Sequence, residues 1–253
     1  MRRYVLTFAL LILPLQLLAD NAWIELAGSR DAKRASVTRS LDTLGLEGAS
    51  LGASHFRTDE SRWTLANFGF NTQANDRLFL QAGMHLGPGE LDGDAFVYRK
   101  LLLGATWLLS ERWSLALTDT YINVHDTVGH VVSTSVTRTT ANGLGITLVG
   151  SDSIGSRIDS QQVGLSFNFA RHYTLLGGIY VGETSNTATL SEVGASTAGV
   201  AVKLREAYLG AGIPIGDYTL TTVLDYLRLD DFDRYEVSLV LKIPLGRGQG
   251  ASR

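Results

Sequence analysis

The chain has 253 residues, of which 45% are hydrophobic, and it carries a formal net charge of −3, with 27 glycines and no cysteine. The absence of cysteine excludes disulfide frameworks, thiolate metal sites and cysteine nucleophiles, and the small negative charge gives no support for a nucleic-acid partner. The length suits one domain or a single barrel better than two compact domains.

The N-terminus has the pattern of a secretory signal peptide. Two basic residues, Arg2 and Arg3, precede an apolar run that Pro14 interrupts, and Ala19 fits the small residue before a cleavage site. We expect a cleaved signal over residues 1–19, because the run is too short and too broken for a retained membrane anchor. The stretch 20–45 that follows predicts either a periplasmic lead-in or an extra strand pair around Trp23.

A two-residue alternation is clear in the segment RLFLQAGMHLG, residues 77–87. One set of alternate residues is apolar: Leu78, Leu80, Ala82, Met84 and Leu86. The other set is mostly polar or small: Arg77, Phe79, Gln81, Gly83 and His85. Because successive side chains of a strand point to opposite faces, this segment predicts a strand with one apolar and one less apolar face.

The same alternation recurs along the chain and predicts twelve strands. They are expected near residues 46–56, 62–72, 77–86, 96–109, 112–124, 131–140, 143–150, 160–169, 173–182, 199–213, 218–229 and 234–245. The pair over 131–150 has the least defined apolar face, and if it lies in an outer loop the count falls to ten. Short turns, such as 73–76, are predicted to alternate with longer loops at 87–95, 125–130, 183–198 and 230–233.

The apolar face is expected to point outward. A barrel of this size encloses a cavity or channel, and a face of Gly, Ser, Thr, Asn and Gln suits a watery interior better than a packed core. Aromatic residues gather near the two predicted rims, as in the interfacial girdles of membrane barrels. They are Trp107, Trp113, Phe169, Tyr173 and Tyr218 beside the short turns, and Tyr121, Tyr226 and Tyr235 near the other rim.

Over roughly residues 44–245 the chain resembles the bacterial outer-membrane β-barrel class. The resemblance implies an all-β fold, a transmembrane antiparallel up-and-down barrel over 46–245 with a tail over 246–253. It also implies residence in the outer membrane, contact with lipid and lipopolysaccharide, and folding by the barrel-assembly machinery. The chain departs from many members of the class, which end on an aromatic residue, because its last strand ends at Leu245 and GRGQGASR follows.

The predicted inner face suggests a narrow channel for small polar or anionic solutes. Its expected lining residues are Arg77, Gln81, Lys100, Lys203, Arg205, Asp225, Arg234, Glu236 and Lys242. Six of these are cations and two are acids, and rings of Lys and Arg favour anions in pores. The alternative is that these charges pair across the lumen and only fill it. No cofactor is expected.

Two other functions stay open. The first is an accessory barrel of an export or envelope-assembly system, without pore activity. The second is a lipid-modifying enzyme, for which His125 and His130, near Ser133 and Ser135, are the best candidates. No nucleophile motif frames them, and the acids of residues 90–94 lack the spacing of a full Ca²⁺ loop. We therefore predict no catalytic and no metal-binding residue.

Overall fold

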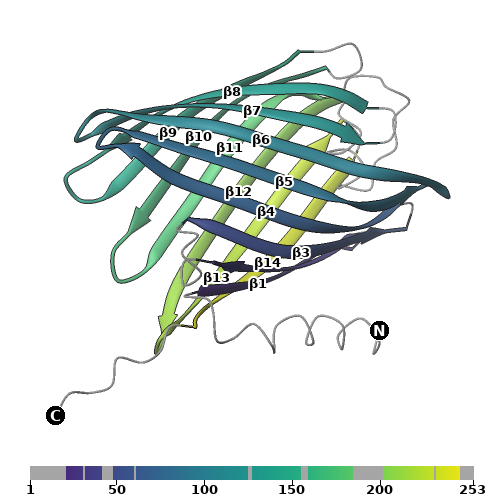
Figure 1. The fold of residues 1–253 in the computed structure, drawn as a ribbon, viewed down its shortest axis with the longest axis horizontal. Coiled ribbons are helices and arrows are strands. Elements are labelled where there is room, and N and C mark those ends of the chain that lie inside the picture. Colours follow the sequence, from purple (N-terminus) through teal and green to yellow (C-terminus); the bar gives the residue numbers. More distant parts are fainter. Residues whose placement is uncertain are drawn as a thin grey trace.

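The computed structural model describes residues 21–30, 32–41, 48–59, 61–124, 127–154, 159–184, 202–230 and 232–245. Within these residues the chain forms fourteen β-strands (Figure 1). They are β1 (Asn21–Gly28), β2 (Ala32–Ser40), β3 (Ala49–Thr58), β4 (Ser61–Asn75), β5 (Leu78–Leu91), β6 (Asp94–Ser110), β7 (Trp113–Val124), β8 (Thr127–Thr139), β9 (Leu144–Ile154), β10 (Ser160–Ala170), β11 (Thr174–Thr184), β12 (Val202–Ile215), β13 (Tyr218–Leu229) and β14 (Phe232–Pro244). The predicted signal peptide and C-terminal tail lie outside the described residues.

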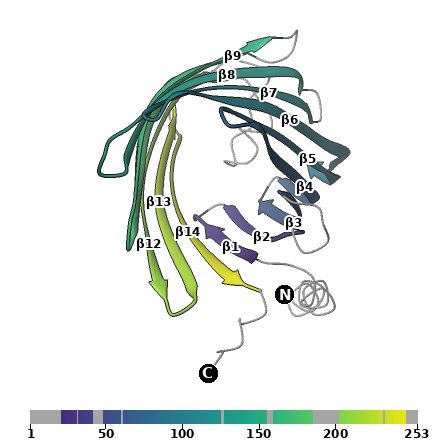
Figure 2. The same cartoon turned by 60° about the vertical axis from the view of Figure 1, so that its left-hand side comes forward.

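The strands form one closed antiparallel barrel in which each strand pairs with its neighbours in the sequence. The wall closes where β1 pairs with β14, with Asn21 opposite Pro244 and Gly28 opposite Val237. Figure 2 shows the sheet curving round until β14 meets β1. Among the described residues no helix is long and apolar enough to cross a membrane.

The predicted fold class is confirmed, but the barrel has fourteen strands instead of twelve. The additional pair is β1 and β2, within the segment 20–45 that the sequence left undecided. The doubtful pair over 131–150 lies in the wall as β8 and β9, so the ten-strand alternative is wrong. The twelve predicted strands correspond to β3 through β14.

Several loops expected on one rim are continuous strand instead. β5 and β6 extend through residues 87–95 and leave a turn of two residues, Asp92 and Gly93. Both have positive φ, 52° and 88°, as a two-residue hairpin of type I′ requires, and Asp-Gly is a preferred sequence for that turn. β8 likewise begins at Thr127, inside the loop predicted over 125–130.

The outer face of the barrel is apolar, as predicted for β5: Leu80, Met84 and Leu86 are about two-fifths exposed. Outward-facing aromatic residues mark both ends of this apolar surface, and on β13 they are Tyr218 and Tyr226. Eight residues of strand at about 3.4 Å each, tilted by about 40°, separate the two tyrosines by a height of about 21 Å. That height matches the apolar band of about 25 Å in membrane barrels.

The two rims of the barrel differ. We call the rim where β1 begins and β14 ends the terminal rim, and the opposite one the far rim. The longest separation between successive strands, from Thr184 to Val202, is at the far rim. Membrane barrels carry short periplasmic turns and longer extracellular loops, and in this chain the longest connection between strands is at the far rim.

Candidate functional site in the barrel lumen

The register places six of the nine predicted lining residues on the inner face of the wall. They are Gln81 on β5, Lys100 on β6, Asp225 on β13, and Arg234, Glu236 and Lys242 on β14. Gln81 donates a hydrogen bond from Nε2 to Thr118 Oγ1 at 3.4 Å, which ties adjacent parts of the inner surface together. Arg77 lies in the turn between β4 and β5 at the terminal rim and is exposed.

Lys203 and Arg205 lie on the outer face, opposite to the predicted direction. β12 runs without a register shift, and Arg205 shares its face with Leu209, which is 59% exposed toward the outside. In the segment KLREAYLGAG, polar residues occupy both alternating sets, so the sequence alone leaves the direction ambiguous. The neighbouring acid, Glu206, takes the inner face instead.

Sequence reasoning missed three charged residues of the inner face: Glu25, Arg34 and Glu206. Glu25 and Arg34 lie on β1 and β2, the strand pair that the alternation did not establish. On the inner face of the described strands, away from the rims, the cations are Arg34, Lys100, Arg234 and Lys242. The acids there are Glu25, Glu206, Asp225 and Glu236. Four cations face four acids, so this part of the lumen is balanced and the expected excess of cations is absent from it.

Much of this charge is paired in a network on one side of the lumen, which we call the ionic wall. Arg34 Nη2 lies 2.9 Å from Glu25 Oε1 and 3.3 Å from Glu236 Oε1. Arg234 Nη2 lies 3.7 Å from Glu236 Oε2, and Glu236 is only 7% exposed. Glu206 and Asp225 lie next to this network on the same face, as diagonal neighbours on β12 and β13. The paired charges give the wall polarity without a net sign.

An aromatic cluster occupies the inner face of β3, β4 and β6 toward the far rim. The rings of Phe56 and Trp63 stack with centroids 4.6 Å apart, and the ring of Tyr98 lies 5.6 Å from that of Trp63. Trp63 is 4% exposed and Tyr98 is 2% exposed, and Ile122 and Val124 extend the buried cluster onto β7. Side chains therefore fill this part of the lumen and narrow it.

A cavity of about 490 Å³ lies between the ionic wall and the aromatic cluster. Glu25 and Arg34 line it from the ionic wall, and Phe56, Trp63 and Tyr98 line it from the cluster. Arg34 Nε has no hydrogen-bond partner among the described residues, so it retains capacity to donate. A solute in the cavity would meet paired charges on one side and aromatic rings on the other.

Three polar side chains complete the lining of this cavity on β4, β5 and β6. His85 Nδ1 lies 2.8 Å from Asn67 Oδ1, and Lys100 is the direct cross-strand partner of His85. Because an amide oxygen accepts, His85 donates from Nδ1 in this arrangement. Within the part of the chain that the structure describes, Lys100 forms no ion pair, so its ammonium is available to a solute.

The residues considered for catalysis do not come together. His130 shares the outer face of β8 with its partner Tyr121 on β7, and its Nδ1 lies 3.0 Å from Asp119 Oδ1. Ser133 and Ser135 have the opposite parity and face the lumen, so neither lies within reach of His130. His125 lies outside the described residues. Among the described residues, no three His, Asp or Glu side chains form a group that could hold a metal ion.

Comparison with known proteins gives no sequence relative and several structural ones. No known protein family matches the chain, and no curated protein matches it. The CymD monoaromatic hydrocarbon channel has a TM-score of 0.56 at 9% identity, over 90% of this chain and 89% of that chain. A deltaS2 mutant of the TodX monoaromatic hydrocarbon channel has a TM-score of 0.56 at 11% identity, over 90% and 91%. The KdgM porin has a TM-score of 0.48 at 10% identity, over 87% and 97%.

At these identities the likeness concerns the fold. The two hydrocarbon channels share the closed β-barrel architecture over most of both chains. Together with the apolar outer face and its aromatic margins, this likeness shows that the chain has the fold of a porin-like transmembrane β-barrel.

Proposed function

We propose that the protein is a passive outer-membrane channel for small solutes that combine an apolar ring or chain with an anionic or hydrogen-bond-accepting group. The observation that carries this proposal is the lumenal cavity, in which the ammonium of Lys100 lies beside the aromatic cluster around Trp63 and Tyr98. Sites for small molecules are typically apolar, with a few polar groups that fix the orientation of the ligand.

Each wall of the cavity has a separate part in passage. The aromatic cluster offers apolar contact that replaces lost hydration, while Lys100 and His85 offer hydrogen-bond donors to an acceptor. The ionic wall, with Arg34 held between two carboxylates, adds polarity but no net field. Conduction requires that binding at such a site be weak enough to allow release.

Selectivity in this proposal depends on one lysine and not on a general excess of positive charge. A strongly anion-selective pore needs rings of like charge. Four cations against four acids give only a mild ion preference, and its sign depends on the charged groups nearest the solute. Benzoate is a suitable probe, because it has an aromatic ring and a carboxylate. Toluene, which keeps the aromatic ring and has neither charge nor hydrogen-bond acceptor, is the matched neutral probe.

The test is single-channel recording of the refolded protein in planar bilayers, with added benzoate. We expect discrete conductance steps that benzoate blocks in a concentration-dependent way. Lys100→Gln is expected to raise the half-blocking concentration about tenfold, since a hydrogen bond to a charged group contributes about 1.5–3 kcal/mol. Block by toluene is expected to stay unchanged in the same variant.

Lys203→Gln is the matched control, because Lys203 lies on the outer face and is expected to leave block by benzoate unchanged. Equal benzoate block in wild type and Lys100→Gln would contradict the role of Lys100. A correctly folded barrel that never conducts would contradict the channel itself and favour the accessory-barrel alternative.

A further inference from the structure

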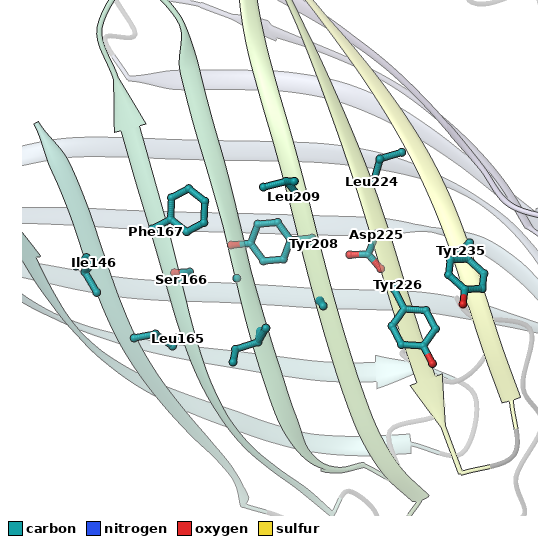
Figure 3. Close-up of a pocket in the computed structure, with 13 residues that line it drawn as sticks. Ile146, Leu165, Ser166, Phe167, Tyr208, Leu209, Leu224, Asp225, Tyr226 and Tyr235 are labelled. Atoms are coloured by element: carbon teal, nitrogen blue, oxygen red, sulfur yellow. The ribbon is translucent and has the colours of Figure 1, made fainter.

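A shallow apolar groove of about 570 Å³ runs over the outer face of β9 to β14 (Figure 3). Its outward-facing lining includes Leu165, Ile179, Leu209, Leu224 and Tyr235. These side chains are between 48% and 71% exposed. Ala207, which lies between Ile179 and Tyr226 in the register, supplies only a methyl group and leaves the wall hollow there. In a membrane this groove faces lipid chains.

Two arginines lie at the end of the groove nearer the far rim. Arg205 is one outward position beyond Ala207 on β12, and Arg228 is one outward position beyond Tyr226 on β13. Arg205 and Arg228 are direct cross-strand partners. Like charges placed directly opposite each other destabilise a sheet unless an anion lies between them.

The nearby acid, Asp233, forms an ion pair with only one of these arginines, Arg228. Asp233 Oδ1 lies 3.8 Å from Arg228 Nε, and it also accepts a hydrogen bond of 2.9 Å from the hydroxyl of Tyr226. Within the described part of the chain, Arg205 forms no ion pair. Two neighbouring guanidinium groups are suited to binding a phosphate, because each guanidinium can donate two parallel hydrogen bonds to phosphate oxygens.

We infer that Arg205, Arg228 and the groove together form a binding site for one molecule of lipid A, the anionic anchor of lipopolysaccharide. A phosphate of its disaccharide lies between the two guanidinium groups, and one acyl chain lies in the groove over Ala207. This inference depends on the outer-membrane placement proposed above, in which the far rim reaches the outer leaflet. It does not depend on solute passage through the lumen.

The position of the arginines along the strand decides which lipid is favoured. They lie at the level where the apolar surface ends toward the far rim, which is the headgroup depth of the outer leaflet. Lipid A concentrates phosphates and several acyl chains at that depth, whereas a phosphatidylglycerol molecule offers one phosphodiester and two chains. Both lipids combine charge and apolar contact in one molecule, so what favours lipid A is the position of the arginine pair at the outer-leaflet end of the groove.

The inference is tested by native mass spectrometry of the refolded barrel in detergent, titrated with hexa-acylated lipid A. We expect one molecule retained per barrel. Each basic residue near a lipid surface contributes about 1 kcal/mol, so the double variant Arg205→Gln/Arg228→Gln is expected to bind about 30-fold more weakly. Ala207→Trp, which fills the groove and leaves both arginines in place, is expected to weaken binding as well.

Arg138→Gln is the matched control, because Arg138 is also outward-facing but lies near the terminal rim, over the ring of Trp113 at 5.5 Å. Heat-modifiable migration in gels confirms that each variant is folded. Unchanged lipid A retention by the arginine double variant would overturn the site. Equal retention of phosphatidylglycerol by wild type would overturn the assignment to lipid A.

Discussion

Replacing Trp63 by alanine tests the aromatic cluster as a structural constriction. Trp63 is 4% exposed and lies against Phe56, Tyr98 and Phe96, with ring centroids 4.6, 5.6 and 6.4 Å away. Removing a buried tryptophan side chain costs about 3–5 kcal/mol, through lost apolar burial and the cavity left behind. The stacked and edge contacts contribute about 0.5–1.5 kcal/mol each within that total. We therefore expect the free energy of unfolding to fall by about 4 kcal/mol.

Urea titration of the protein in lipid vesicles, followed by circular dichroism, measures this loss. Trp107→Ala is the control, because Trp107 is 39% exposed on the outer face and belongs to the aromatic margin. That substitution is expected to lower the free energy of unfolding by about 1 kcal/mol. In planar bilayers Trp63→Ala is also expected to raise the unit conductance, since the indole narrows the lumen. A loss no greater than that of Trp107→Ala, with unchanged conductance, would refute the role of the cluster.

Two further predictions concern the far-rim turn and the ionic wall. Gly93→Ala is expected to destabilise the barrel by about 1–2 kcal/mol, because Gly93 has a φ of 88° although nothing lies within 4 Å of an added Cβ. Gly150→Ala, where the space is equally open and φ is not positive, should change urea stability little, and equal effects would contradict a backbone origin. Arg34→Gln leaves Glu25 and Glu236 without their shared cation, so reversal potentials under a salt gradient are expected to shift toward cation selectivity. A shift toward anions, or none, would count against the balanced lumen.

Local alternation predicted the fold class because it reports directly on the two faces of a wall that separates lipid from water. The opening segment illustrates this: Leu80 and Met84 face outward, while Gln81 and His85 face the lumen. β2 was not established because Ala32–Ser40 offers few large apolar side chains to an outward face. A strand with weak alternation, such as β2, is difficult to predict from sequence, because its position is determined by pairing with the strands on either side.

The candidate site was less predictable because it depends on pairs that are distant in sequence. Arg34 and Glu236 are 202 residues apart, and only the closure of the barrel brings them within 3.3 Å. The Asp92-Gly93 turn, in contrast, had a local hairpin signal, but its acids were weighed as possible metal ligands. Alternation alone predicts that Lys100 faces the lumen. That its direct cross-strand neighbour is His85, and not an acid, is seen only from the register of β5 and β6.

The closing pair of strands has a consequence for how the barrel forms. Every other ladder joins consecutive strands, so it can form as soon as the second strand of the pair is available. The ladder between Asn21–Gly28 and Val237–Pro244 joins the two ends of the chain, and closing so long a loop is the slowest kind of contact to establish. It includes the approach of Lys242 Nζ to the ring of Trp23 at 6.0 Å, which forms only on closure. This junction therefore carries the largest loop-closure entropy of any ladder in the wall.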